Sequence, residues 1–189
     1  MAIQEKVQKV SLKKIHYAVM TDEVAETYGD VKTLTMPIDL TLTPNYSEAT
    51  LDAGDRVVAT DAQLDTITVA GQVVDLPTEV LADWYGHKMS DDKGLIMNSN
   101  DTPNYIAVGF ESGNKLVWLF KNKFKPTEES NSTKKKGEIT YLQSGFSGES
   151  IPLEDGTIKH TVITTDTGVT ETAETFFTAV KKPEVTPVP

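Results

Sequence analysis

The chain has 189 residues, no cysteine and a formal net charge of −10. A chain of this length can form one domain with a substantial core, and without cysteine it has no disulfides, thiol catalysis or cysteine-ligated zinc. So acidic a protein is expected to repel nucleic acid rather than bind it by counterion release.

Charge is distributed unevenly along the chain. Residues 51–92 hold nine Asp and Glu against two basic residues, a net charge of −7, whereas residues 93–136 hold eight Lys against four acids, a net charge of +4. Two solvated surface regions would give this pattern. Complementary surfaces for head-to-tail self-association would give it as well.

No segment is expected to enter a membrane. The longest apolar runs, such as residues 116–120, are far below the roughly 20 residues needed to cross a bilayer. The first six residues lack the apolar stretch of a secretory signal. We therefore expect the protein to be made and to fold in the cytoplasm.

The first half of the chain predicts strands separated by turns. Residues 15–19 predict a strand, and residues 34–43 show the clearest alternation of apolar and polar side chains. Pro37 lies on the polar face and cannot donate to a ladder, which predicts an unpaired edge or a bulge. Asp39 is the one acid among the threonines of that face, and it is either a solubility charge or part of a lumen or interface.

A poorly patterned segment and a helix come next. Residues 44–65 are the least regular part, and they form either a projecting arm or a surface loop with a short strand. Residues 65–75 predict a strand. Residues 77–85 predict a short packed helix, because Pro77 suits the first turn, apolar side chains share one face, and Gly86 suits the position after the helix.

The second half predicts more strands. Residues 105–110 and 116–124 form the most secure hairpin, with a turn at residues 112–114. Residues 126–137 predict a polar loop. Further strands are predicted at residues 138–143, 158–165 and 173–179. We divide the chain into a β domain at residues 1–180 and a Pro-rich tail at residues 181–189.

No residue set predicts catalysis, a metal or a cofactor. The three histidines lie far apart, and the acids of residues 52–65 lack the spacing of an EF-hand. Residues 144–148 resemble but do not match a nucleophile elbow. Trp84 and Trp118 lie on apolar faces and are predicted core residues, and His87, just after the helix, is predicted to be structural.

Several segments, in order, resemble one known family. They are residues 15–18, 28–32, 84–87, 92–95, 103–112 and 117–124, the strongest being Pro103 to Ser112 followed by Val117 to Phe124. Over roughly residues 1–165 the chain resembles the major tail protein, or tail tube protein, of long-tailed siphophage-type bacteriophages of Gram-positive hosts.

This resemblance implies a mainly β, sandwich-like or barrel-like subunit with one short helix and long projecting loops. Such subunits form hexameric rings that stack head to tail into a tube, through which DNA leaves the capsid. The resemblance further implies an acidic lumen, loops that bridge rings, and a place in the virion beside the tape measure, tail tip and tail terminator proteins. DNA passes through without specific binding.

Our first hypothesis is therefore a self-assembling structural protein with no cofactor. The candidate lumen-facing residues are Thr35, Asp39 and Thr41. The candidate inter-subunit residues are Tyr46, Asp52, Asp55, Arg56, Lys134, Lys135 and Lys136. The alternative hypothesis is a monomeric β-sandwich binding or adhesion module, and a hydrolase on a β scaffold is disfavoured because no catalytic set is visible.

Overall fold

The computed structural model describes residues 11–52, 57–127 and 143–183. It is mainly β, with 54% of the described residues in strands and 8% in helices, which confirms the predicted fold class. The elements in chain order are β1 (Leu12–Asp22), β2 (Thr27–Tyr28), β3 (Lys32–Leu34), β4 (Pro37–Asp52), β5 (Val57–Val73), α1 (Thr78–Tyr85), β6 (Lys88–Met89), β7 (Leu95–Ile96), β8 (Ile106–Ser112), β9 (Lys115–Lys125), β10 (Ser144–Ile151), β11 (Lys159–Ile163) and α2 (Ala173–Phe176).

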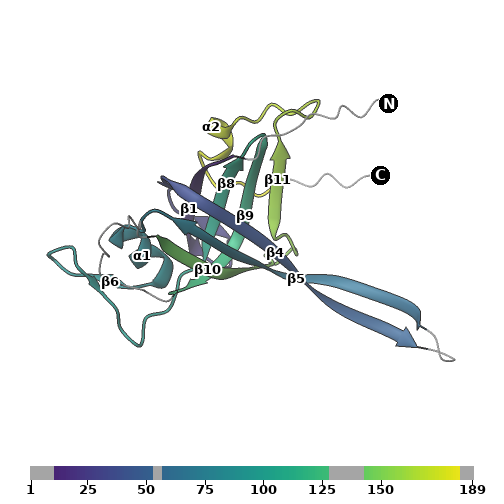
Figure 1. The fold of residues 1–189 in the computed structure, drawn as a ribbon, viewed down its shortest axis with the longest axis horizontal. Helices are drawn as coiled ribbons and strands as arrows, with labels where there is room; N and C mark the ends of the chain where they lie inside the picture. Colours follow the sequence, from purple (N-terminus) through teal and green to yellow (C-terminus); the bar gives the residue numbers. More distant parts are fainter. Residues whose placement is uncertain (1–10, 53–56, 128–142, 184–189) are drawn as a thin grey trace, which may run out of the picture.

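One large antiparallel sheet organises the molecule (Figure 1). Its strands run in the order β2-β1-β8-β9-β10-β5-β4, with β3 also beside β1. The sheet forks at β9, because residues 115–119 pair with β11 and residues 121–125 pair with β10. β6 and β7 form a separate two-stranded sheet.

The predicted hairpin at residues 105–124 is confirmed as β8 and β9. Phe110 lies opposite Val117 and Gly109 opposite Trp118, around a turn at Gly113 with φ of +61°. Successive side chains on β9 point to opposite faces, so Leu119 joins one apolar cluster and Trp118 another. Both faces of this hairpin are covered, and the predicted core position of Trp118 is confirmed.

The larger cluster gathers around α1. Trp84 is fully buried and stacks on Phe124, with ring centroids 4.5 Å apart, while Tyr17 and Phe146 meet it edge-on at 5.8 and 5.2 Å. The helix ends as predicted, because Gly86 adopts φ of +70° and its N–H bonds the carbonyl of residue 82. The amphipathic helix thus supplies the aromatic centre of the core.

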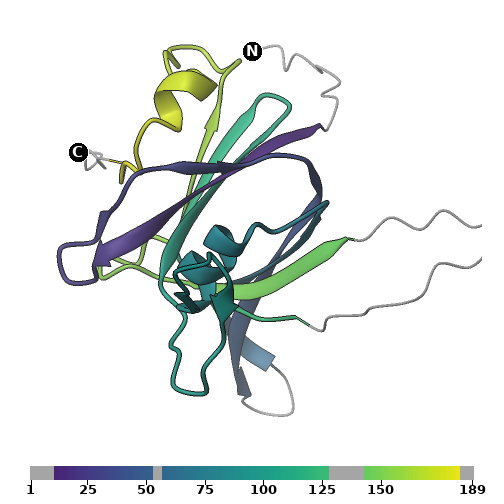
Figure 2. The same cartoon turned by 90° about the vertical axis from the view of Figure 1, so that its left-hand side faces the viewer.

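The smaller cluster joins Trp118, on the other face of the hairpin, to Phe176 and Phe177 of the C-terminal segment. Figure 2 shows the backbone of that segment, in yellow, with α2. The strand predicted at residues 173–179 is wrong, because these residues include α2. Thr172 and Thr175 cap that helix reciprocally, and the Trp118 Nε1–H donates to the Phe176 carbonyl at 3.1 Å. A capping box closed by threonine in place of Glu or Gln left no clear helix signal in the sequence.

The single strand predicted at residues 34–43 is also wrong. Leu34 ends β3, opposite Ile15 of β1, whereas Leu42 lies in β4, opposite Val69 of β5. Met36 turns the chain between them with φ of +63°. The apolar side chains on both sides of this corner fall at even-numbered residues. The alternation of apolar and polar residues therefore did not reveal the corner that separates β3 from β4.

β10 was not predicted, and the strand expected at residues 138–143 falls almost wholly outside the described residues. The reason is a requirement for small side chains: a Cβ on Gly148 would lie 2.4 Å from the Lys123 carbonyl oxygen. Glycine and serine therefore occupy positions where an apolar alternation would have revealed a strand.

Candidate assembly surface

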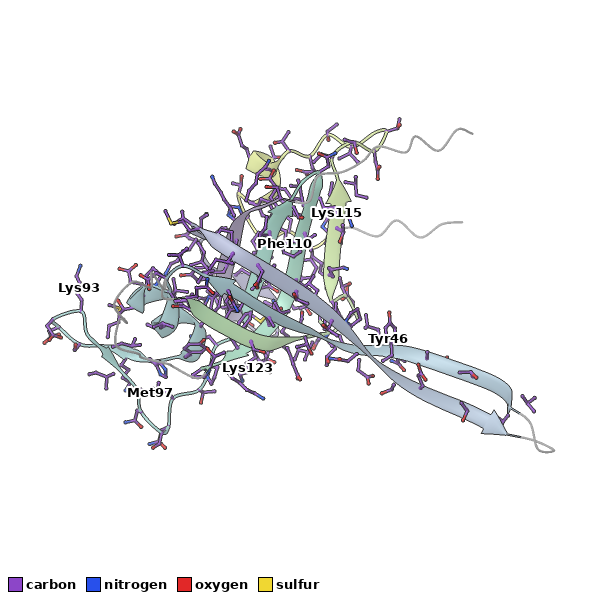
Figure 3. The ribbon with its side chains drawn as sticks, in the orientation of Figure 1. Tyr46, Lys93, Met97, Phe110, Lys115 and Lys123 are labelled. Carbon is purple, nitrogen blue, oxygen red and sulfur yellow. The ribbon has the colours of Figure 1, made fainter. Side chains whose placement is uncertain are left out.

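The most unusual feature is an arm formed by the outer halves of β4 and β5, residues 45–52 and 57–65. It leaves the body of the molecule as a two-stranded ribbon (Figures 1 and 3). Pairing is continuous from Tyr46 opposite Leu64 to Leu51 opposite Ala59. Where it is described, at residues 45–52 and 57–65, this segment is paired rather than irregular, and of the two predictions the projecting arm fits.

Side chains on both faces of the arm are exposed. Tyr46, Leu51 and Val58 are 59%, 62% and 55% exposed. Partners directly opposite each other point to the same side, so Tyr46 and Glu48 share the face of Leu64 and Ala62. The opposite face carries Ala49 with Asp61, along with Leu51. Isolated two-stranded hairpins are marginally stable in water, so this arm lacks the burial that holds the body together.

β4 is also an edge strand, since β5 is its only partner in the described residues. The ladder is irregular between Pro37 and Asp39, which confirms the irregularity predicted from Pro37. Pro37 and Pro44 lack an N–H and protect the body part of this edge from pairing. Residues 45–52 contain no proline, so the edge of the arm has no such protection.

The outward face of β4, β5, β10 and β9 is polar, and its residues form rows across the sheet. The first row is Asp39, Gln72 and Gly145; the second is Thr41, Ala70, Ser147 and Lys125; the third is Thr43, Thr68, Glu149 and Lys123. Asp39 and Thr41 are exposed on this face. Thr35 lies in the corner between β3 and β4 and is not part of the rows, although it is exposed as well.

Several candidate inter-subunit residues lie outside the described part of the chain. These are Asp55, Arg56, Lys134, Lys135 and Lys136. Asp52 ends β4, where its backbone pairs with that of Val57. Tyr46 is the candidate whose placement supports an arm directly, because its ring lies largely in solvent where the arm leaves the sheet (Figure 3).

Sequence reasoning missed a lysine-lined groove at the β9 edge of the polar face. It has a volume of about 350 Å³, and its lining includes Tyr105, Lys123, Lys125, Pro126, Glu149 and Ile151. The ammonium groups of Lys121 and Lys123 lie 4.7 and 4.6 Å from the centre of the Tyr105 ring. Such cation–π contacts hold long side chains in place. The alternating lysines at residues 121, 123 and 125 were the available sequence signal.

A partly buried polar cluster joins Tyr17, Asp83 and Lys32. The Tyr17 hydroxyl donates to Asp83 at 2.9 Å, and Lys32 pairs with the same carboxylate at 2.6 Å. Burial and the hydrogen bond to Asp83 raise the pKa of the Tyr17 phenol. The phenol therefore stays protonated at neutral pH and is not activated as a nucleophile or base.

His87 anchors the loop after α1. Its Nδ1 lies 2.8 Å from Asp101 Oδ2, and both side chains are buried. Hydrogen bonds from the Asn98 N–H and from His87 lower the pKa of Asp101. This geometry agrees with the structural role predicted for His87.

The described residues hold no group of three or more His, Cys, Asp or Glu placed to bind a metal ion. None of the helices within those residues is both long and apolar enough to span a membrane. No protein-family model matches the chain, and a search of curated proteins finds no match.

Proposed function

We propose that this protein is a structural subunit that assembles with copies of itself into stacked rings, and that these rings form the tail tube of a long-tailed bacteriophage. In that role it has no turnover. Its partners are its own copies and the tape measure, tail tip and tail terminator proteins, and DNA passes through the lumen during ejection. The location is the phage tail, after synthesis in the host cytoplasm.

The observation that carries this proposal is the arm. A ribbon with exposed Tyr46, Leu51 and Val58 on its two faces buries little of its own surface. Ordering such a ribbon costs roughly 1–2 kcal/mol of backbone entropy per residue. Because burial within the monomer offsets little of this cost, contacts with another molecule would stabilise the arm. A Pro-free edge on residues 45–52 further suits strand addition between copies.

The polar face supports a conduit. Its β9 end carries Lys123 and Lys125. Its β4 and β5 part instead offers short hydroxyl and carboxylate groups, from Asp39, Thr41, Thr43 and Thr68, and Asp39 there repels a phosphate backbone. A face of this kind suits a wall past which DNA moves. It complements the arm, because one element would join subunits while the other would line the passage.

Electron microscopy of the purified protein tests the proposal. We expect hollow tubes or rings when the protein is concentrated over a range of salt. A variant with Tyr46–Asp65 replaced by Asn-Gly removes the arm, including Tyr46 and Glu48, and keeps the pair of Asn45 and Thr66 beside a tight turn. It should remain folded and lose assembly at least tenfold in sedimentation. Tubes from this variant equal to those of wild type would contradict a role for the arm.

A monomeric binding module remains the second candidate. The loop between α1 and β8 favours it, because Met89, Ile96 and Met97 expose 38%, 51% and 65% of their surface. Exposed apolar side chains gathered on a loop can dock a ligand or partner. A protein that stays monomeric at high concentration, with and without tail tip components, would favour this function.

A further inference from the structure

Two surfaces of this molecule complement each other. Residues 45–65 hold five acids and one base. In the described part of the arm, Tyr46, Leu51 and Val58 are exposed, as are Glu48 and Asp61. The groove at the β9 edge presents two lysines, Lys123 and Lys125, against one acid, Glu149. The apolar and aromatic part of its lining comes from Tyr105, Pro126 and Ile151. An acidic, apolar projection and a basic, partly apolar groove are the pairing expected of a polar-rimmed interface.

The arm and the groove of one molecule face different ways. Tyr46 lies opposite Leu64, and Leu64 packs against the main core cluster. Tyr46 and Glu48 therefore continue the core side of the ribbon. Lys123 and Lys125 belong to the outward rows of the sheet, and Figure 3 shows Lys123 on the body of the molecule, away from Tyr46. A second copy is the natural occupant of the groove.

We propose that the groove beside Lys123 and Lys125 is the receptor for the arm of another copy, with Tyr46 as the anchor and Glu48 as the charge partner. The groove volume of about 350 Å³ is at the small end of ligand-sized pockets, so it accepts one aromatic side chain rather than a strand. Tyrosine is a frequent anchor at interface centres. This inference rests on the proposed function and names the surface that the arm contacts.

Charge reversal tests the contact with matched controls on both sides. Glu48→Lys changes the anchor face, and Asp61→Lys makes the same charge change on the opposite face of the arm. Lys125→Glu changes the groove, and Lys115→Glu makes the same change at the other end of β9. All four side chains are exposed, so folding should persist, as checked by thermal unfolding.

Glu48→Lys and Lys125→Glu should each lower the assembled fraction at least tenfold in sedimentation. The controls should stay within twofold of wild type, and combining Glu48→Lys with Lys125→Glu should restore at least half of the assembly. Equal effects of Glu48→Lys and Asp61→Lys, equal effects of Lys125→Glu and Lys115→Glu, or no rescue in the double variant would each overturn the inference.

The absence of cysteine permits a second measurement that does not depend on polymer yield. One batch carries Glu48→Cys and the other Lys125→Cys, and the mixture is oxidised. We expect a disulfide-linked heterodimer, and Asp61→Cys in place of Glu48→Cys should give at least fivefold less. Wild-type tubes without this crosslink would overturn the arm-to-groove contact and leave the proposed function standing. No tubes from the wild-type chain, together with no crosslink from the mixed cysteine variants, would count against both.

Discussion

The body and the arm of this molecule are made from the same two strands and differ in what they bury. In the body, β5 places Ile67 and Val69 in the core, 3% and 0% exposed. A few residues away, Tyr46 and Val58 on the arm are more than half exposed. The same two strands pair in both regions, but the register shifts between Asn45 and Tyr46, where Asp65 is passed over. A bulge therefore marks the point at which the ribbon leaves the body.

This contrast shows that strand pairing and stability are separate properties. Burial at roughly 25 cal/mol per Å² of apolar surface stabilises the body, whereas a hydrogen bond exchanged with water contributes about 1 kcal/mol net. The arm has the backbone hydrogen bonds but buries little apolar surface. We therefore expect the body to set the free energy of unfolding and the arm to set association.

The largest expected effect is in the body. Trp84→Ala removes a fully buried ring that touches Phe124, Tyr17 and Phe146. It should lower the free energy of unfolding by about 3–5 kcal/mol, measured by urea denaturation. A loss below about 1 kcal/mol would mean that the body does not depend on this aromatic cluster.

A smaller effect is expected where β9 and β10 approach closely. A Cβ at residue 148 would lie 2.4 Å from a backbone oxygen of Lys123, which cannot move aside as a side chain can. Gly148→Ala should therefore cost about 1–3 kcal/mol. Gly145→Ala on the same strand is the control, because its nearest neighbours lie at 3.9 Å; equal urea midpoints for the two variants would contradict the argument.

Acid should weaken the body modestly through His16, whose ring stacks on Phe177 at 4.2 Å. Burial, then the charge of Lys14, lowers the pKa of His16 from 6.5 to about 4, against an opposing contribution from Glu111. Between these values the unfolded chain binds the proton and the folded chain does not, so stability falls as pH falls from about 6.5 to about 4.

Because His16 is partly exposed, solvent screening limits this loss to about 1 kcal/mol. Urea unfolding at several pH values measures it, and His16→Gln, which does not titrate, should have a shallower pH dependence. Identical slopes for the two proteins would assign the acid sensitivity to other groups.

The smallest effect on stability is expected in the arm. Replacing Ala49–Asp61 by Asn-Gly removes no residue of the two core clusters, and residues 49–51 and 58–61 are exposed. The free energy of unfolding should therefore change by about 0.5 kcal/mol or less. Urea unfolding of the monomer at low concentration is the measurement. A loss of several kcal/mol would show that the arm is part of the cooperative body.

The sequence predicted an element correctly where residues within that element determine its bounds and register. The helix of residues 77–85 carried its boundaries in Pro77 and Gly86. The hairpin of residues 105–124 carried its register in alternation and a short turn. The buried position of Trp84 followed from its place on an apolar helix face.

Other features depended on neighbours distant in the sequence. Position 148 requires glycine because the backbone of β9 lies too close for a Cβ. The helix α2 forms where the Phe176 carbonyl accepts a hydrogen bond from Trp118. The corner at Met36 arises because Leu34 and Leu42 pair with different strands. In the same way, the groove joins lysines of β9 to Tyr105 and Glu149 from separate parts of the chain.

The sequence by itself determined a mainly β chain, its one amphipathic helix and its central hairpin, because alternation, capping and turn preferences act within a few residues. Only the tertiary structure decided that residues 45–52 and 57–65 form a paired, projecting arm and that a lysine-lined groove exists. Whether a paired ribbon packs on a core or projects into solvent depends on the course of the other strands, and no local pattern records that course.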